Sequence, residues 1–166
     1  MKGALLGFAI CSVTSLACGA EQNATTASSA SGQTITRAGT QSPSPGPPEY
    51  FTGRVTLNPL TLPNPDISVA SAHVTFEAGA RSAWHTHPKG QYLIVTDGVG
   101  LTQEWGRQIQ EIHAGDVVWC PPGIKHWHGA TPKAKMTHLA LTASADGKLV
   151  NWMEKVSDEQ YSAGAR

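Results

Sequence analysis

The chain predicts an all-β fold, a closed antiparallel barrel or sandwich that ends in a short helix. From residue 50 onward, short runs rich in Val, Ile, Thr, Trp and Tyr are separated by Gly, Pro or Asp. Several short strands at this spacing favour a closed all-β architecture. The chain carries no net charge, so its charge balance predicts neither a nucleic-acid-binding nor a membrane-binding surface.

The first twenty residues have the composition of a secretory signal peptide. Lys2 precedes an apolar run, and small residues follow at positions 17–20. The run is shorter than the ~20 residues of a membrane-spanning helix. Cleavage after Ala17 would leave Cys18 first and open to lipidation, whereas cleavage after Ala20 would release a soluble protein. We therefore expect an exported protein, periplasmic or secreted, that is either soluble or anchored by a lipid on Cys18.

Residues 21–48 follow as a linker dominated by Ala, Ser, Thr, Gly, Gln and Pro. Such a composition buries too little apolar surface to offset the entropy of ordering the chain, so this segment is expected to be disordered. Residues 49–162 then form a single domain. Cys120 is the only cysteine of that domain, which excludes an internal disulfide there, and we expect it to be a small buried apolar side chain.

Apolar runs place the individual elements of the domain. The expected strands are residues 67–76, 91–96, 100–105, 107–112, 116–120 and 136–142. After the last strand, residues 151–156 and 157–161 predict a short terminal helix with Ser157 as its N-cap.

Three histidines and a glutamine stand at a spacing that is typical of a metal site. His85 and His87 are two residues apart, so on an extended segment both side chains point to the same side. Gln91 opens the next strand, and His126 follows a Pro-x-Gly turn. Imidazole nitrogens and an amide oxygen suit Mn, Fe, Ni or Zn. The pattern predicts one divalent metal ion per chain, held by these four residues.

The blocks around these residues resemble the two motifs of the cupin superfamily. Residues 79–98 follow Gly-x5-His-x-His-x3-Glu-x6-Gly, with Gln91 in place of glutamate. Residues 115–130 follow Gly-x5-Pro-x-Gly-x2-His-x3-Asn, with Ala130 in place of asparagine. The resemblance implies a double-stranded β-helix, the cupin jelly-roll barrel, with a short C-terminal helix. It also implies a homo-oligomer, because cupins usually associate through their sheet edges.

More narrowly, residues 50–161 resemble the small manganese-dependent cupins with hydroxynitrile lyase activity, which also carry glutamine at the Gln91 position. The matching segments are 50–53, 74–77, 83–88, 111–113, 125–129, 136–140 and 158–161. The resemblance implies that the ion is manganese and that the substrate is a small molecule, a cyanohydrin cleaved to aldehyde and cyanide.

The same resemblance implies the roles of further residues. His138 would accept the proton of a cyanohydrin hydroxyl whose oxygen is polarised by the bound ion. Ala72, Val74 and Thr142 would leave room for an aryl group, although Thr142 departs from the glutamine of the best-matching lyases. Apart from the resemblance, His128 follows His126 by two residues, so it would either orient a metal ligand from outside the first coordination sphere or be an exposed loop residue.

His73 and His113 are expected to lie away from the site. His73 falls between two pocket positions, so strand alternation points it outward, and His113 stands beside a Gly-Asp turn.

Gln91 bears on the type of reaction. Three imidazoles and an amide are all neutral, so they leave the full charge on the ion, which favours electrophilic activation of an oxygen. Without an anionic ligand, higher oxidation states are disfavoured, which argues against an oxygen-using cupin of the dioxygenase type. A non-catalytic cupin, in which metal stabilises the barrel and a small ligand binds, is the remaining alternative. We favour the lyase.

Overall fold

The computed structural model describes residues 32–64 and 66–163. The predicted signal peptide at 1–20 and the first part of the predicted linker lie outside the described residues. The chain divides into two compact units, Met1–Thr34 and Ile35–Arg166. The second unit holds every described strand and the described helix.

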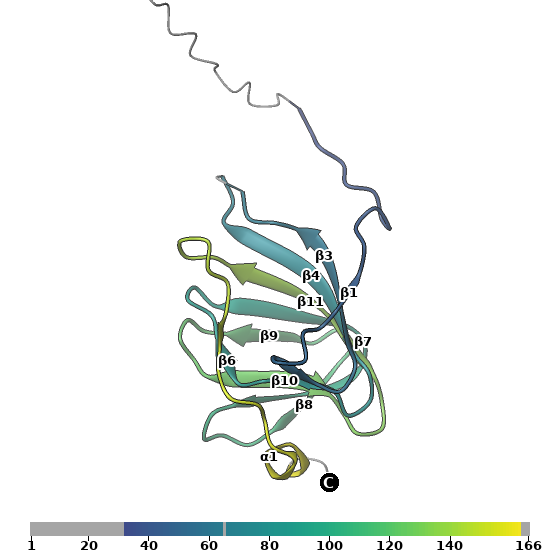
Figure 1. Ribbon diagram of the computed structural model, residues 1–166, viewed down its shortest axis with the longest axis vertical. Helices are drawn as coiled ribbons and strands as arrows, with labels where there is room; N and C mark the ends of the chain where they lie inside the picture. The colour runs from purple at the N-terminus through teal and green to yellow at the C-terminus, as the bar shows by residue number, and fades with distance from the viewer. Residues whose placement is uncertain (1–31, 65, 164–166) are drawn as a thin grey trace, which may run out of the picture. The chain divides into compact units, whose positions relative to one another are not determined.

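Two antiparallel sheets face each other and confirm the predicted all-β barrel (Figure 1). The strands are β1 (Ser44–Pro45), β2 (Phe51–Thr52), β3 (Val55–Thr61), β4 (Val69–Phe76), β5 (Arg81–Ser82), β6 (His85–Thr86), β7 (Gln91–Glu104), β8 (Gln110–His113), β9 (Val117–Cys120), β10 (His126–Ala130), β11 (Met136–Ala143) and β12 (Asn151–Trp152), followed by helix α1 (Asp158–Ser162). One sheet runs β1-β3-β4-β11-β7-β9, and the other contains β2, β5, β10, β7 and β8, with β6 attached to β10 and β12 attached to β6.

The long strand β7 belongs to both sheets. Its first half pairs with β9 and β11, and its second half pairs with β8 and β10. The sequence predicts two strands at 91–96 and 100–105, whereas the structure joins them into one bent strand. The bend passes through Gly98, whose φ of 77° is unfavourable for other residues. A Cβ atom at Gly98 would lie 2.0 Å from the carbonyl oxygen of Lys135.

Alternation along β11 decides which of its side chains face the barrel interior. Every second residue is buried: Met136, His138, Ala140 and Thr142. A bulge in the partner strand keeps these residues facing inward along the whole pair, because Val95 and Asp97 face consecutive residues of β11 and Thr96 is left out of the register. The buried face of β11 therefore meets the buried face of β7, which begins with Gln91.

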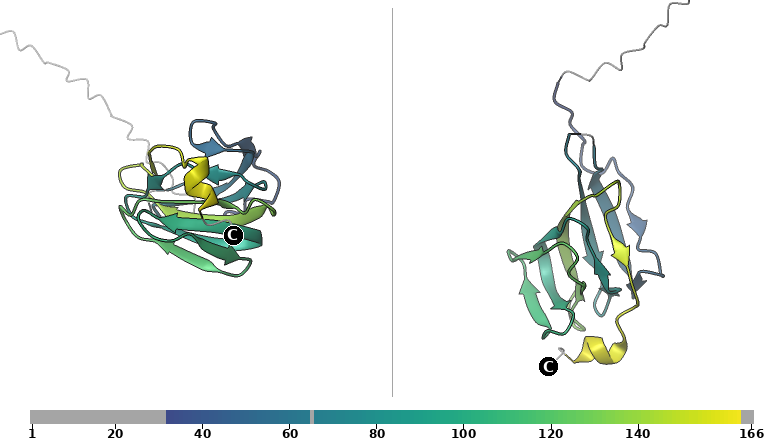
Figure 2. Two further views of the ribbon diagram at one scale, coloured as in Figure 1. Left: turned by 90° about the horizontal axis from the view of Figure 1, so that it is seen from below. Right: turned by 90° about the vertical axis from the view of Figure 1, so that its left-hand side faces the viewer.

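The core has a large cluster between the sheets and a smaller one beneath α1. Phe76 and Met136 are fully buried in the first, and Trp84 and Trp127 are buried in the second. Helix α1 covers one end of the barrel (Figure 2). Ser157 caps it as predicted, through a reciprocal capping box with Gln160.

Buried Arg81 attaches this helix to the barrel. Its guanidinium donates to the carbonyl of Val156 and to the carboxylate of Asp158, at 3.1 Å and 2.5 Å from Nη2. Its guanidinium carbon also lies 4.6 Å from the centre of the Tyr161 ring. The Tyr161 hydroxyl in turn donates to the carbonyl of Ala130 at 2.8 Å. The helix is thereby attached to the barrel through the buried Arg81 guanidinium and through the hydrogen bond from Tyr161 to the Ala130 carbonyl.

Two further segments differ from the sequence-based expectation. Residues 151–156 are not helical: Asn151 and Trp152 form β12, which pairs with β6. The Trp152 ring stacks on Tyr50 at 4.7 Å, a contact across the fold that no local pattern predicts. Ser44–Pro45, which the sequence places in the linker, form β1 and pair with β3.

The bend at Gly98 can be tested against a second motif glycine. Gly115 also has a positive φ, 100°, but a Cβ atom there would meet nothing within 4 Å. We expect Gly115→Ala to lower the free energy of unfolding by about 1–2 kcal/mol, through backbone strain alone. Gly98→Ala should cost clearly more, because the backbone of Lys135 must also move. Urea unfolding of both variants measures the difference, and equal losses would show that the close approach at Gly98 is unimportant.

Candidate metal centre

The predicted site residues come from neighbouring strands and meet inside the barrel. They are His85 in β6, His87 just after it, Gln91 at the start of β7, His126 and His128 in β10, and His138 and Thr142 in β11. All seven are buried. The strand register places His126 opposite His85 and Thr142 opposite Gln91, so residues far apart in the chain become neighbours.

Backbone carbonyls orient the three histidines predicted as ligands. Nδ1 of His85 lies 2.9 Å from the carbonyl oxygen of Ala83, and Nδ1 of His126 lies 2.9 Å from that of Ile124. Nδ1 of His87 is 2.8 Å from the Leu149 oxygen. A carbonyl only accepts, so each Nδ1 carries the hydrogen and each Nε2 keeps its lone pair. This arrangement selects the tautomer that a metal-binding histidine needs.

The three rings lie close together. The ring centres of His85 and His126 are 4.3 Å apart, those of His85 and His87 5.0 Å, and those of His87 and His126 5.3 Å. Nε2 of His87 and Nε2 of His126 are buried and have no hydrogen-bond partner among the described residues. The cluster therefore presents several lone pairs to one small volume.

Gln91 adds an oxygen to these nitrogens. Its Nε2 donates to Oγ1 of Thr142 at 2.8 Å, which leaves Oε1 buried without a hydrogen-bond partner in the described part of the chain. Buried polar atoms normally have a partner, so these unpaired acceptors need an explanation. A divalent cation would satisfy imidazole nitrogens and an amide oxygen together. The residues present fit one metal ion.

His128 is buried in the same cluster, and the expectation of an exposed loop residue is wrong. Its ring centre lies 5.2 Å from that of His85, and the potential ligand nitrogens of His85, His126 and His128 lie within 4.8 Å of one another. Unlike the three predicted ligands, His128 has no hydrogen-bond partner at Nδ1 among the residues that the structure describes. His128 therefore lies against the site without the orienting bond that its neighbours share.

His138 completes the cluster from the opposite sheet. Its ring centre is 4.9 Å from that of His128 and 5.8 Å from that of Phe76. Both of its ring nitrogens are buried without a hydrogen-bond partner in residues 32–64 and 66–163. An imidazole in this state has a nitrogen lone pair that is free to take a proton.

Burial lowers the pKa of all five imidazoles, because an apolar interior disfavours the charged form. The pKa falls to about 4 for His126 and to about 3 for His138. For His85 and His128 the neighbouring histidines lower the pKa further, since two positive charges at this distance repel each other. For His87 burial is also the largest cause of the lowered pKa, and the hydrogen bond to the Leu149 carbonyl opposes it. The cluster is consequently neutral at pH 7.

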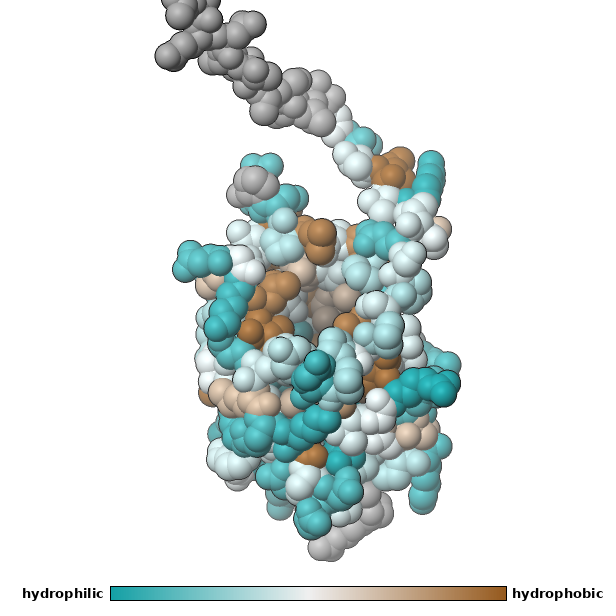
Figure 3. Space-filling model, in the orientation of Figure 1, coloured by the Kyte–Doolittle hydropathy of each residue, from teal (hydrophilic) through white to brown (hydrophobic). Residues whose placement is uncertain are grey.

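A cavity of about 400 Å³ opens onto this cluster. The predicted pocket residues Ala72, Val74 and Thr142 all line it, together with His138 and Gln91. Figure 3 shows the hollow, with apolar residues gathered at its rim. The cavity is large enough and apolar enough to hold an aromatic molecule against the histidines.

Sequence reasoning missed part of the cavity wall. The additional lining residues come from both ends of the domain and include Pro47, Phe51, Leu149, Val150 and Trp152. The stacking of Trp152 on Tyr50 brings these two ends together. The aromatic residues themselves were the only signal, and a linear pattern does not say which of them meet.

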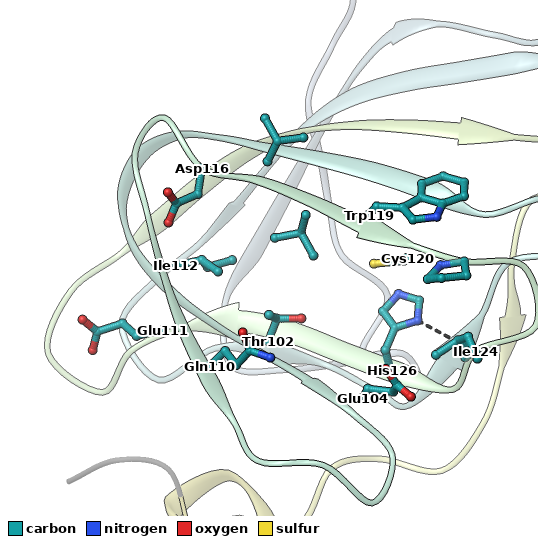
Figure 4. Close-up of a pocket in the computed structure, with 13 residues that line it drawn as sticks. Thr102, Glu104, Gln110, Glu111, Ile112, Asp116, Trp119, Cys120, Ile124 and His126 are labelled. Carbon is teal, nitrogen blue, oxygen red and sulfur yellow. Dashed lines mark hydrogen bonds between the residues drawn. The ribbon is translucent and has the colours of Figure 1, made fainter.

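A second cavity, of about 420 Å³, lies beside β8, β9 and β10 (Figure 4). It is lined by charged residues such as Glu104 and Asp116, and His126 lines it as well. The other predicted ligands line the first cavity instead. His126 thus lines the second cavity, and its ring centre lies 4.3 Å from that of His85, which lines the first.

The remaining candidates behave as structural or surface residues. Cys120 is buried, and burial raises the pKa of its thiol to about 12, which fits the predicted apolar role. His113 is exposed and lies 3.1 Å from the carboxylate of Glu111. His73 is half-buried on β4 and pairs with Leu139, between the pairs that face the cavity.

Comparison with known proteins agrees with this architecture. The cupin domain family matches residues 72–141. An (R)-mandelonitrile lyase of Granulicella tundricola is 58% identical over 128 residues, which cover 76% of this chain and 97% of that protein. The chain belongs to the cupin family.

Solved structures show the same barrel. A cupin-like protein from Thermotoga maritima is 35% identical to this cupin, with a TM-score of 0.70, over 80% of this chain and 98% of that one. A cupin 2 conserved barrel domain protein from Rhodopseudomonas palustris, at 17% identity and a TM-score of 0.59, covers 73% and 81%. The fold predicted from the two motifs is thereby confirmed. In the described part of the cupin, no helix is long and apolar enough to cross a membrane.

The buried histidines predict how the stability of the metal-stripped cupin depends on pH. Their pKa values are lowered in the folded state, so between about pH 6.5 and the folded values the unfolded chain binds more protons. Stability should therefore fall as the pH drops below about 6.5, by up to about 1.4 kcal/mol per pH unit for each histidine.

Urea unfolding of the metal-stripped protein at pH 7, 6 and 5 measures this slope. His138→Phe removes one buried imidazole from the cluster. It should reduce the slope of the unfolding free energy against pH by up to about 1.4 kcal/mol per pH unit, the contribution of one proton. An unfolding free energy that is the same at pH 7 and pH 5 would contradict the assignment.

Proposed function

We propose that this cupin is a divalent-metal-dependent lyase that cleaves cyanohydrins to an aldehyde and hydrogen cyanide. One observation carries the proposal: a neutral, unpaired imidazole, His138, lines the same apolar cavity as a cluster of oriented metal-ligand side chains. The similarity to a protein named (R)-mandelonitrile lyase, over nearly its whole length, supports this reaction class.

We assign the metal to His85, His87, Gln91 and His126. The three histidines are those whose Nδ1 atoms are committed to backbone carbonyls, and Gln91 is the residue whose amide oxygen is left unpaired. When bound there, a divalent ion would polarise an oxygen of the substrate and lower the pKa of its hydroxyl. We propose manganese as the ion because the chain resembles manganese-dependent lyases. The same ligand types would also bind Fe, Ni or Zn.

His138 would act as the catalytic base. Its lowered pKa keeps the imidazole unprotonated, so it can take the proton of the cyanohydrin hydroxyl. The hydroxyl oxygen then forms the carbonyl double bond, and the carbon–carbon bond breaks with its electron pair leaving on cyanide. Cyanide takes the proton from the imidazolium, which restores His138 and releases hydrogen cyanide. The reverse sequence adds hydrogen cyanide to an aldehyde.

The shape of the cavity favours an aryl substrate. Ala72 and Val74 are small residues on β4, opposite the β11 positions Ala140 and His138 in the strand register. Phe51, Leu57 and Trp152 add apolar surface, which would hold a phenyl ring away from water.

We propose that the protein is exported, from the signal-like composition of residues 1–20, with Cys18 as a site of lipid attachment if cleavage follows Ala17. A homo-oligomer is proposed from the cupin family alone. Fractionation of cells and mass spectrometry of the mature N-terminus would test export, and light scattering would test the oligomer.

The base can be tested by substitution at His138. We expect His138→Ala to lower the rate of cyanide release from mandelonitrile by about 100-fold or more, because general-base catalysis is removed. His113→Ala, which removes an exposed histidine, is the matched control and should leave the rate unchanged. Full activity of a folded, metal-loaded His138→Ala variant would rule out this residue as the base.

Metal removal provides a separate test. The chelator-stripped protein should release no cyanide above background, and manganese should restore release more fully than Fe, Ni or Zn. Metal analysis alongside the assay shows which ion is bound. A loaded, folded protein without cyanide release would instead favour a dioxygenase-type or non-catalytic cupin, and an equal rate in stripped and loaded protein would exclude metal dependence.

A further inference from the structure

Thr142 makes a contact with the metal site that its place in the cavity wall does not require. Its Oγ1 accepts the hydrogen bond from Nε2 of Gln91 at 2.8 Å, and both side chains are buried, each 6% exposed. The two residues are directly opposed in the pairing of β7 and β11, so the strand register itself brings them together.

The direction of the Gln91 amide matters because its two ends differ. The oxygen can be a metal ligand, whereas the NH2 group presents only hydrogen atoms and would repel a cation. With Oε1 turned toward the histidines, the NH2 group points to the barrel wall and needs an acceptor there. Among the described residues, Thr142 is the only one that accepts a hydrogen bond from the NH2 group of Gln91.

We propose that Thr142 is a positioning residue that holds the amide oxygen of Gln91 toward the metal ion, in addition to shaping the cavity. The inference rests on the proposed metal assignment of Gln91 but not on the proposed lyase reaction. Without the hydroxyl, the ligand-competent orientation leaves a buried N–H group unpaired. The hydroxyl thereby stabilises the metal-bound state, while the methyl group of Thr142 remains available to the substrate cavity.

The test is a titration of the metal-stripped, full-length protein with Mn²⁺, in which the paramagnetic resonance signal of the free ion measures the bound fraction. Thr142→Val keeps the shape of the side chain and removes the acceptor. We expect it to weaken Mn²⁺ binding about 10–100-fold, the usual effect of losing a partner behind a metal ligand. Thr142→Ser keeps the hydroxyl and should bind Mn²⁺ within about threefold of the parent protein, since the hydrogen bond is retained.

A control on the same strand tests whether the effect on Mn²⁺ affinity depends on where the lost threonine hydroxyl lies. Thr137 is on β11, outside the cavity, and its hydroxyl lies 2.9 Å from that of Thr75. Thr137→Val should leave Mn²⁺ affinity unchanged. Thermal unfolding of the metal-stripped variants checks that each is folded. If Thr142→Val does not fold, Thr142→Ser remains as a folded variant for the comparison.

A double-mutant cycle with Gln91→Ala then shows whether Thr142 acts through the amide. In the Gln91→Ala background, Thr142→Val should change Mn²⁺ affinity by less than about twofold, because the group that it orients is gone. An equal loss in both backgrounds, or no loss in either, would overturn the proposal. Because the readout is metal binding, a failure of cyanide release leaves this result unaffected.

Discussion

The centre of the barrel is governed by one constraint: the buried acceptor lone pairs of His87, Gln91 and His126 receive no hydrogen bond from the described residues. His87 and His126 use their N–H groups on backbone carbonyls, and Gln91 uses its NH2 group on Thr142. The atoms that these three residues leave without a partner are therefore acceptors. Protons cannot satisfy them at pH 7, because burial lowers the pKa of each imidazole. The barrel is therefore built around a positive charge that a metal ion would supply.

Strand register makes this convergence possible. Gln91 and Thr142 are opposed in one sheet, and His85 and His126 are opposed in the other. A slip of one residue would turn any of these side chains to the outer face. The bulge that leaves Thr96 out of the register keeps inward-facing residues opposed along the full length of β7 and β11. The positive φ of Gly98 lets β7 pass from one sheet to the other.

The chemical character of the site follows from its two neighbouring environments. One side is an apolar cavity that suits an aryl group. The other is a set of neutral side chains, imidazoles and an amide, that as ligands would leave a bound cation strongly electrophilic. His138 lies where these environments meet, and burial keeps its imidazole neutral. The same apolar surroundings that keep this imidazole neutral also weaken it as a base, so the proposed proton transfer would require a bound ion to lower the pKa of the substrate hydroxyl.

The sequence by itself determined the fold class and the metal-ligand candidates, because both depend on local spacing. His85 and His87 share a face through strand alternation, and Ser157 begins a helix through its own side chain. Tertiary structure alone decided the rest. Trp152 belongs to a strand because it stacks on Tyr50 and pairs with His85. His128 is buried because its neighbours enclose it. The orientation of Gln91 depends on Thr142, a residue remote in sequence, because an amide is directed only by the partner that accepts its hydrogen.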